Sequence, residues 1–277
     1  MEAPFPDAAL YLHCVLLPQI LYELDRMETM EAFILHCSDN FPNLGRYVDR
    51  IKIGEAIEII TAKSCGLSIS YDRLEYLGDA VLKLLQTNTL MNSKDEKLRQ
   101  WIHCLHEGDL TALRSAMGCN ERLKEAAECA GIDSFILTRP LSRGQWVPNG
   151  LEAYKQDSNG PVYLPDFSPS EKVKADVIEA LLGAIYIHFG YENAIEVAEE
   201  LGISLPKEIN YPVSIAGESS ISQELLEKAS SFLAMEKFRN KEILLEATTH
   251  PSKIHSKVPS YQRLEWVGDA GTTNSTS

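Results

Sequence analysis

Basic residues are scarce in this chain of 277 residues. Lys and Arg number 26 against 40 Asp and Glu, which gives a formal net charge of −14 at pH 7. Tight wrapping around a nucleic acid needs many lysine and arginine contacts to phosphates, so this composition argues against that mode of binding by this chain alone. It leaves open chemistry on a phosphate substrate, because sites that hold divalent cations concentrate carboxylates.

The chain also lacks a long apolar run and a regular cysteine framework. The uncharged run Ala8–Tyr22 contains Pro18 and is shorter than the roughly 20 apolar residues that span a membrane. Glu2 and Asp7 precede it in place of a basic start, so we expect neither a secretory signal nor a membrane span. The six cysteines form no Cys-x-x-Cys pair, which favours reduced thiols and an intracellular protein, cytoplasmic or nuclear.

Strand-like alternation of apolar and polar residues is almost absent, and apolar residues recur at helical spacing. Hydrophobic residues make up 44% of the chain, which is enough for a sizeable core. The sequence therefore predicts an all-α fold, with a turn over residues 40–45. Helices are predicted over residues 8–37 (broken at Pro18), 51–62, 71–90, 93–103, 109–117, 121–130, 172–189, 192–201, 222–233 and 242–247.

Two stretches differ in composition from the predicted helices. Residues 138–170 hold five prolines and three glycines and are typical of a long loop or insertion. Residues 205–219 carry two prolines and are the best candidate for a linker.

One decapeptide occurs twice. Residues 71–80 read YDRLEYLGDA and residues 261–270 read YQRLEWVGDA, so seven of ten positions are identical. Each copy places a glutamate and an aspartate four residues apart, which puts both carboxylates on one face of a helix. These pairs are Glu75 with Asp79, and Glu265 with Asp269.

By itself, the first pair also allows an interpretation without any function. An isolated Glu-x-x-x-Asp on a helix is more often a solvated acidic face, here with Asp79 paired to Lys83. Gly78 lies between the two acids, and a residue this small would let another helix approach closely.

A second type of acidic pair, Asp176 and Glu179, lies in an apolar helical segment. Partly buried carboxylates need a partner or a cation, because an uncompensated buried charge is costly. A surface pair matched to Lys172 and Lys174 remains an alternative, and these lysines could also contact a phosphate. With the first pair, these residues would supply four hard oxygen ligands of the kind that Mg²⁺ or Mn²⁺ takes.

Several segments, in order along the chain, resemble one known family. YDRLEYLGDAVL at residues 71–82 closely resembles the signature of ribonuclease III, and ADVIEALLGA at 175–184 resembles the second acidic block of that family. HEGDLTALR at 106–114 resembles the segment between them, and TTHPS at 248–252 resembles the helix that precedes the signature. The repeated signature, with an insertion in the first copy, is similar to the tandem catalytic region of Dicer-like members.

The resemblance implies a set of site residues. Carried over by position, Glu75, Asp79, Asp176 and Glu179 would be the catalytic carboxylates that bind Mg²⁺, with Mn²⁺ as an alternative. In the second copy Glu265 and Asp269 match, but only small and mostly polar residues follow Ala270. The resemblance therefore implies an incomplete second site.

The resemblance also implies a domain organisation. Residues 1–50 would be a helical connector segment, and residues 51–204 the first ribonuclease III domain, with its insertion at about 138–170. Residues 205–219 would be a linker, and residues 220–277 the truncated start of a second ribonuclease III domain.

The implied function is metal-dependent hydrolysis of double-stranded RNA, in small-RNA production and RNA silencing. Two domains of this family pair to form one valley for the duplex, so the resemblance implies a homodimer, or pairing with another ribonuclease III domain, and no membrane partner. The alternative is a catalytically idle ribonuclease III fold that serves as an RNA-binding or assembly module. The net charge and the incomplete second copy favour that alternative, and the complete first set of carboxylates disfavours it.

Overall fold

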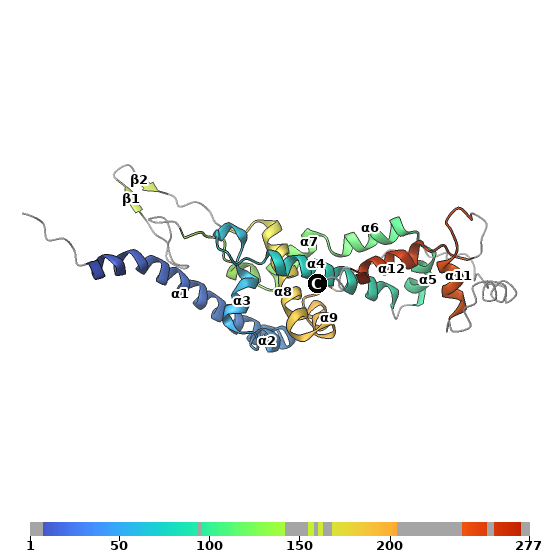
Figure 1. The fold of residues 1–277 in the computed structure, drawn as a ribbon, viewed down its shortest axis with the longest axis horizontal. Helices are drawn as coiled ribbons and strands as arrows, with labels where there is room; N and C mark the ends of the chain where they lie inside the picture. Colours follow the sequence, from blue (N-terminus) through green and yellow to red (C-terminus); the bar gives the residue numbers. More distant parts are fainter. Residues whose placement is uncertain are drawn as a thin grey trace, which may run out of the picture. The chain divides into compact units, whose positions relative to one another are not determined.

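The computed structural model describes residues 8–92, 96–141, 155–157, 160–162, 168–203, 240–253 and 258–272. In chain order its elements are α1 (Ala8–Asn40), α2 (Pro42–Val48), α3 (Ile53–Ile60), η1 (Lys63–Cys65), α4 (Asp72–Met91), α5 (Glu96–Cys104), α6 (Glu107–Met117), α7 (Asn120–Cys129), η2 (Ile132–Phe135), β1 (Lys155–Asp157), β2 (Gly160–Val162), α8 (Glu171–Phe189), α9 (Tyr191–Glu200), α11 (Lys241–Ala247) and α12 (Gln262–Thr272) (Figure 1). The all-α prediction is confirmed, and one short hairpin is the exception among these elements.

The structure differs from the sequence prediction at Pro18. Helix α1 continues through Pro18, where a break was predicted. A proline inside a helix removes one backbone hydrogen bond and adds a local clash, which costs about 3 kcal/mol. The C-terminal half of α1 offsets this cost through a buried face at helical spacing, which includes Tyr22, Met30, Phe33 and Cys37.

A short helix replaces the turn predicted over residues 40–45. Pro42 begins α2, a position where the missing N–H of proline costs nothing. The next two backbone N–H groups, of Asn43 and Leu44, donate to the Glu200 carboxylate at 3.0 and 2.8 Å. This acceptor lies more than 150 residues away along the chain, so local sequence could not indicate it.

The predicted insertion at 138–170 contains the hairpin. Strands β1 and β2 pair antiparallel, with Lys155 opposite Val162 and Asp157 opposite Gly160. Most of the remaining insertion lies outside the described residues, as do the predicted linker 205–219 and the predicted helix 222–233.

The described residues divide into two compact units. One draws on residues 1–79 and 120–202, and the other on residues 80–119 and 203–277. In the first unit α8 packs against α7, α9, α3 and α2 (Figure 1). Nearly every residue of α8 from Ala175 to Ile185 is buried, so this helix forms the centre of the unit. The exception is Glu179, which is half-buried.

The second unit has a core of its own, in which α12 lies against α6 (Figure 1). Its buried cluster consists of Leu90, Leu98, Ile102, Leu110, Met117 and Trp266. Trp266 belongs to the second copy of the repeated decapeptide and is 2% exposed. The guanidinium of Arg114 lies 4.8 Å from the centroid of the Trp266 ring, a cation–π contact that adds to this packing.

Over the part of the chain that the structure describes, no helix combines the length and apolarity needed to cross a bilayer. Among the cysteine side chains described, Cys37 and Cys65 are buried, Cys119 is half-buried and Cys129 is exposed, and all four are free thiols.

Candidate metal centre

Two glycines bring α4 and α8 into backbone contact. A Cβ placed on Gly78 of α4 would overlap the carbonyl group of Glu179 on α8. A Cβ on Gly183 of α8 would overlap the carbonyl oxygen of Leu74 and lie 3.1 Å from the Gly78 nitrogen. The expectation that Gly78 admits another helix is therefore confirmed, and that helix is the one that carries the second acidic block.

Substitution of Gly78 should separate the two helices. Gly78→Ala is expected to lower the free energy of unfolding by about 1–3 kcal/mol, because the added methyl group meets rigid backbone. The measurement is urea denaturation. Gly268 provides the matched control, since it holds the same place in the second copy and a Cβ added there would meet nothing within 4 Å among the described residues. Gly268→Ala should be neutral or stabilising by up to about 1 kcal/mol, and equal losses in both variants would contradict the account.

Three carboxylates meet where α4 and α8 touch. Glu75, Asp176 and Glu179 each contribute one oxygen, and the three oxygens lie within 4.8 Å of one another. Asp176 is 6% exposed, while Glu75 and Glu179 are half-buried. The fourth predicted ligand, Asp79, is half-buried one turn further along α4 and lies outside this group of three.

One lysine faces this cluster. The Lys172 ammonium lies 3.4 Å from Asp176 Oδ2 and 3.9 Å from Glu75 Oε1, and its side chain is 69% exposed. The Asp176 carboxylate is the main cause of the raised pKa of Lys172. Lys174 instead contacts Glu128 at 2.7 Å and Asp133 at 3.4 Å. The two lysines that flank the acidic block in sequence thus have different roles, and Lys172 alone of the two contacts the cluster.

Burial and a neighbouring carboxylate raise the pKa of Glu75. Burial is the largest cause and the neighbouring Asp176 carboxylate is the second, while Lys172 acts in the opposite direction. Asp79 adds a smaller upward contribution, so it is close enough to share the field of the cluster. Carboxylates held together in this way favour either a proton or a cation.

The raised pKa of Glu75 predicts that the stability of the metal-free protein depends on pH. The folded-state pKa of Glu75 is raised, so the metal-free fold binds this proton more tightly than the unfolded chain does. Its stability should therefore decrease as the pH rises from about 4.3, the ordinary pKa of a glutamate, through the folded-state value. Thermal denaturation across this range should show the decrease in wild type and a smaller one in Glu75→Gln. Identical pH profiles for the two proteins would rule out the shift.

A buried tyrosine also contacts the cluster, and the sequence did not indicate it. Tyr71 is 4% exposed and its hydroxyl donates to Asp176 Oδ2 at 3.2 Å. Burial is the first cause of the raised pKa of this phenol, and the Asp176 carboxylate is the second, so the hydroxyl keeps its proton as a donor. A sequence feature that could have pointed to Tyr71 is the tyrosine at the first position of both copies of the decapeptide.

The second copy repeats the backbone geometry of the first. The Tyr71 N–H donates to the Thr61 carbonyl at 3.0 Å, and the Tyr261 N–H donates to the Thr249 carbonyl at 3.0 Å. An arginine–glutamate pair recurs as well. Arg73 lies 3.4 Å from Glu58, and the pair Arg263–Glu246 is buried, with two hydrogen bonds of 2.8 and 2.6 Å. The structural repeat therefore extends upstream of the decapeptide, into α3 and α11.

The acidic side chains of the second copy are arranged differently. Glu265 and Asp269 are both exposed on α12. Within the described residues, the one group of acidic and other metal-ligating side chains close enough to hold an ion is Glu75, Asp176 and Glu179. Among the described residues, the first copy thus contributes Glu75 to a carboxylate cluster, and the second copy contributes to none.

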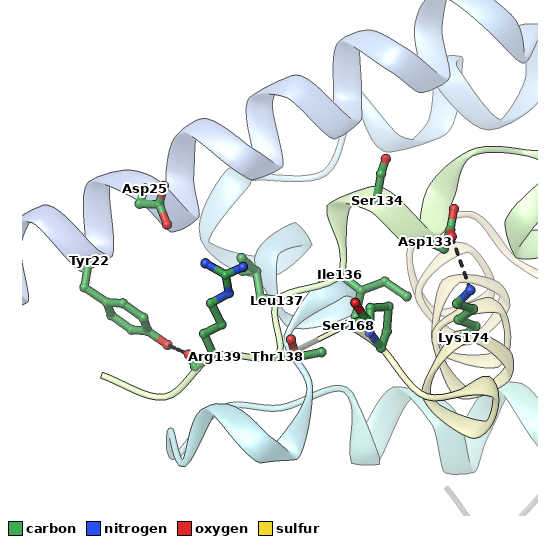
Figure 2. Close-up of a pocket in the computed structure, with 11 residues that line it drawn as sticks. Tyr22, Asp25, Asp133, Ser134, Ile136, Leu137, Thr138, Arg139, Ser168 and Lys174 are labelled. Carbon is green, nitrogen blue, oxygen red and sulfur yellow. Dashed lines mark hydrogen bonds and ion pairs between the residues drawn. The ribbon is translucent and has the colours of Figure 1, made fainter. Parts of the chain in front are cut away.

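A polar cavity of about 330 Å³ lies elsewhere in the first unit, between α1, the residues around η2 and the start of α8. Figure 2 shows Tyr22 and Asp25 on α1, opposite Asp133, Arg139 and Lys174. Lys174 is already held by Asp133 and Glu128, and the Tyr22 hydroxyl donates to the Arg139 carbonyl at 2.8 Å. These groups are engaged with one another, so the carboxylate cluster is the better candidate for a functional site.

One family model matches the segment of the chain that contains this cluster. Residues 72–190 match the family model described as Ribonuclease III domain. This chain carries a ribonuclease III domain. The matched range begins with α4 and ends just after α8, so the ribonuclease III domain contains all three clustered carboxylates and Asp79.

The chain that holds this ribonuclease III domain is similar to Dicer and Dicer-like proteins. It is 29% identical over 263 residues to Endoribonuclease Dicer homolog 1 of Arabidopsis thaliana, with 79% of this chain and 13% of that protein aligned. It is 31% identical over 232 residues to Dicer-like protein 2 of Cryphonectria parasitica, with 77% and 14% aligned. With Dicer-like protein 2 of Coccidioides immitis (strain RS) it shares 37% identity over 221 residues, covering 76% and 14%. The chain thus spans only 13% to 14% of the length of these relatives.

Proposed function

We propose that this chain is the catalytic module of a Dicer-like endoribonuclease that hydrolyses double-stranded RNA in small-RNA production and RNA silencing. The observation that carries the proposal is the cluster of Glu75, Asp176 and Glu179, whose oxygens lie within 4.8 Å of one another. It lies inside the ribonuclease III domain, and the relatives with similar sequence over most of this chain are Dicer and Dicer-like proteins.

The residues present fit a divalent metal ion. Three carboxylate oxygens are hard ligands, which Mg²⁺ and Mn²⁺ prefer to the softer donors of cysteine or histidine. Two of these carboxylates are close enough for Asp176 to raise the pKa of Glu75, and Lys172 is a partial and exposed counter-charge. Mg²⁺ is the ion that we propose for this centre, with Mn²⁺ as a substitute.

The residues at the proposed metal centre have different roles. Glu75, Asp176 and Glu179 would hold the ion, which when bound supplies an activated water and charge compensation for phosphodiester hydrolysis. The Lys172 side chain is mostly exposed, so its ammonium can move from Asp176 to an oxygen of a substrate phosphate. Asp79 adds negative charge near Glu75 and belongs to the proposed catalytic set, either as a direct ligand or through water.

We further propose that this domain works in a pair, with a second copy or with another ribonuclease III domain. Tyr76 is 81% exposed on α4, although it holds the same place in the first copy that buried Trp266 holds in the second. The apolar cluster around Trp266 indicates what such an aromatic side chain packs against, namely a helix pair like α5 and α6. A partner domain that offers such a pocket would bury Tyr76.

Cleavage of end-labelled duplex RNA by the full chain in Mg²⁺ tests the proposal. Product should form in both strands, and chelation of the metal should abolish it. An Asp79→Ala variant should cleave more slowly, because the charge near Glu75 changes. If wild type binds duplex RNA without cleaving it at any Mg²⁺ concentration, the idle module is the better description. Sedimentation at the assay concentration reports whether the active species is paired.

A further inference from the structure

We propose that Tyr71 is a positioning residue of the carboxylate cluster, whose hydroxyl fixes the orientation of Asp176 for metal binding. This inference rests on the proposed metal centre and deepens it. Tyr71 would touch neither substrate nor reacting atoms, and would act through Asp176. Its hydroxyl donates to Asp176 Oδ2 at 3.2 Å.

The tyrosine is held rigidly enough to direct its neighbour. Its N–H donates to the Thr61 carbonyl at 3.0 Å, and its own carbonyl accepts the N–H of Glu75 at 2.8 Å. Thr61 is fully buried, and its hydroxyl donates to the Ile57 carbonyl at 2.6 Å. Thr61 also forms a backbone bridge with Leu137. The Tyr71 backbone is therefore anchored at the point where α4 begins, and its side chain is buried there.

Asp176 needs such a partner. A carboxylate rotates easily about its last side-chain bond, so its two oxygens exchange places unless a neighbour distinguishes them. Oδ2 receives the Tyr71 hydroxyl at 3.2 Å and lies 3.4 Å from the Lys172 ammonium. The Lys172 side chain is 69% exposed, whereas Tyr71 is 4% exposed. The buried hydroxyl is thus the fixed contact of the two.

The equivalent tyrosine of the second copy, Tyr261, does not position a metal ligand among the described residues. Tyr261 makes the equivalent hydrogen bond to Thr249, and its ring contacts His250 at a centroid distance of 5.8 Å. Among the described residues, no cluster like that of Asp176 forms around the second copy. Tyr261 is therefore a matched control, since the same Tyr→Phe change removes a hydroxyl with no metal ligand to position.

The test is Mn²⁺ binding to the full chain, measured by calorimetry. Hydrogen bonds that orient metal ligands typically affect metal affinity by about 10–100-fold. Tyr71→Phe should bind Mn²⁺ about 10-fold more weakly, while Tyr261→Phe should match wild type. In the Asp176→Asn background, Tyr71→Phe should have no further effect. Cleavage by Tyr71→Phe should be slow at low Mg²⁺ and should recover at saturating Mg²⁺, which a general packing defect would not produce.

The outcomes separate this inference from the proposed function. If Tyr71→Phe binds Mn²⁺ as wild type does while Glu75→Gln binds weakly, the metal centre stands and the positioning role of Tyr71 is wrong. If wild type shows no site that depends on Glu75, the metal centre and the inference fail together. If Tyr71→Phe and Tyr261→Phe weaken binding equally, the hydroxyl of Tyr71 has no particular connection to Asp176.

Discussion

Glu75→Gln is expected to reduce Mg²⁺-dependent cleavage of duplex RNA by at least about 100-fold, because residues that merely orient a metal ligand already affect affinity by about 10–100-fold. The change keeps the size of the side chain and removes one of three negative charges that lie within 4.8 Å of one another. The protein should remain folded, since Glu75 is only half-buried and burial, the main cause of the raised pKa of its carboxyl, acts against its charged form in the metal-free fold. The measurement is the initial rate of cleavage, with circular dichroism to verify the fold.

The repeat offers the control for this variant. Glu265→Gln makes the same change at the same motif position, but Glu265 is exposed on α12 and belongs to no described metal-ligating group. Its activity should stay within about two-fold of wild type, as for most exposed substitutions away from such features. An equal loss in both variants, or in neither, would mean that the cluster on α4 and α8 is not the catalytic site.

Trp266→Ala is expected to lower the free energy of unfolding of the second unit by about 3–5 kcal/mol, the usual cost of truncating a buried tryptophan. Trp266 is 2% exposed among Leu90, Leu110 and Met117, and the Arg114 guanidinium lies over its ring. Its removal leaves a cavity and exposes the apolar face of α6. Urea denaturation and faster hydrogen exchange in α6 and α12 would measure the loss.

Tyr76→Ala is the matched control for Trp266→Ala. Tyr76 holds the corresponding place in the first copy and is 81% exposed. The stability of the isolated chain should change by less than about 0.5 kcal/mol, as for other surface substitutions. A Trp266→Ala variant as stable as Tyr76→Ala would show that α12 does not pack against α6 in solution.

The sequence predicted most helices because their apolar residues recur at the helical period. The predicted bounds of α4, α6, α7, α8 and α9 lie within two residues of those observed. Local pattern was insufficient where a distant partner decides the structure. The N-terminus of α2 donates to the Glu200 carboxylate, and α1 continues through Pro18 because its later turns bury one face within the first unit.

The sequence likewise predicted part of the candidate site. The spacing placed Glu75 with Asp79, and Asp176 with Glu179, on common helix faces, but spacing cannot show that two helices meet. Gly78 was the sequence signal for that contact, and its close approach to Glu179 is what brings the acids together. The contact of Tyr71 with Asp176 joins residues 105 positions apart, and no periodic pattern encodes it.

The two Glu-x-x-x-Asp pairs are also placed differently from what the shared motif suggests. Glu75 joins the carboxylates of α8, while Asp79 lies outside that group of three. The nearly identical second motif keeps the local hydrogen bonds of the first but leaves Glu265 and Asp269 exposed. The motif therefore accounts for the helix and the backbone hydrogen bond at its start, and the helix that packs on it determines whether its acids form a site.

The most direct test of the metal centre is anomalous diffraction from crystals of the full chain grown with Mn²⁺. We expect a peak bounded by Glu75, Asp176 and Glu179, which disappears in crystals of the Glu75→Gln variant. No peak at these three carboxylates in crystals of an RNA-cleaving wild type, or a peak that persists unchanged in Glu75→Gln, would contradict it.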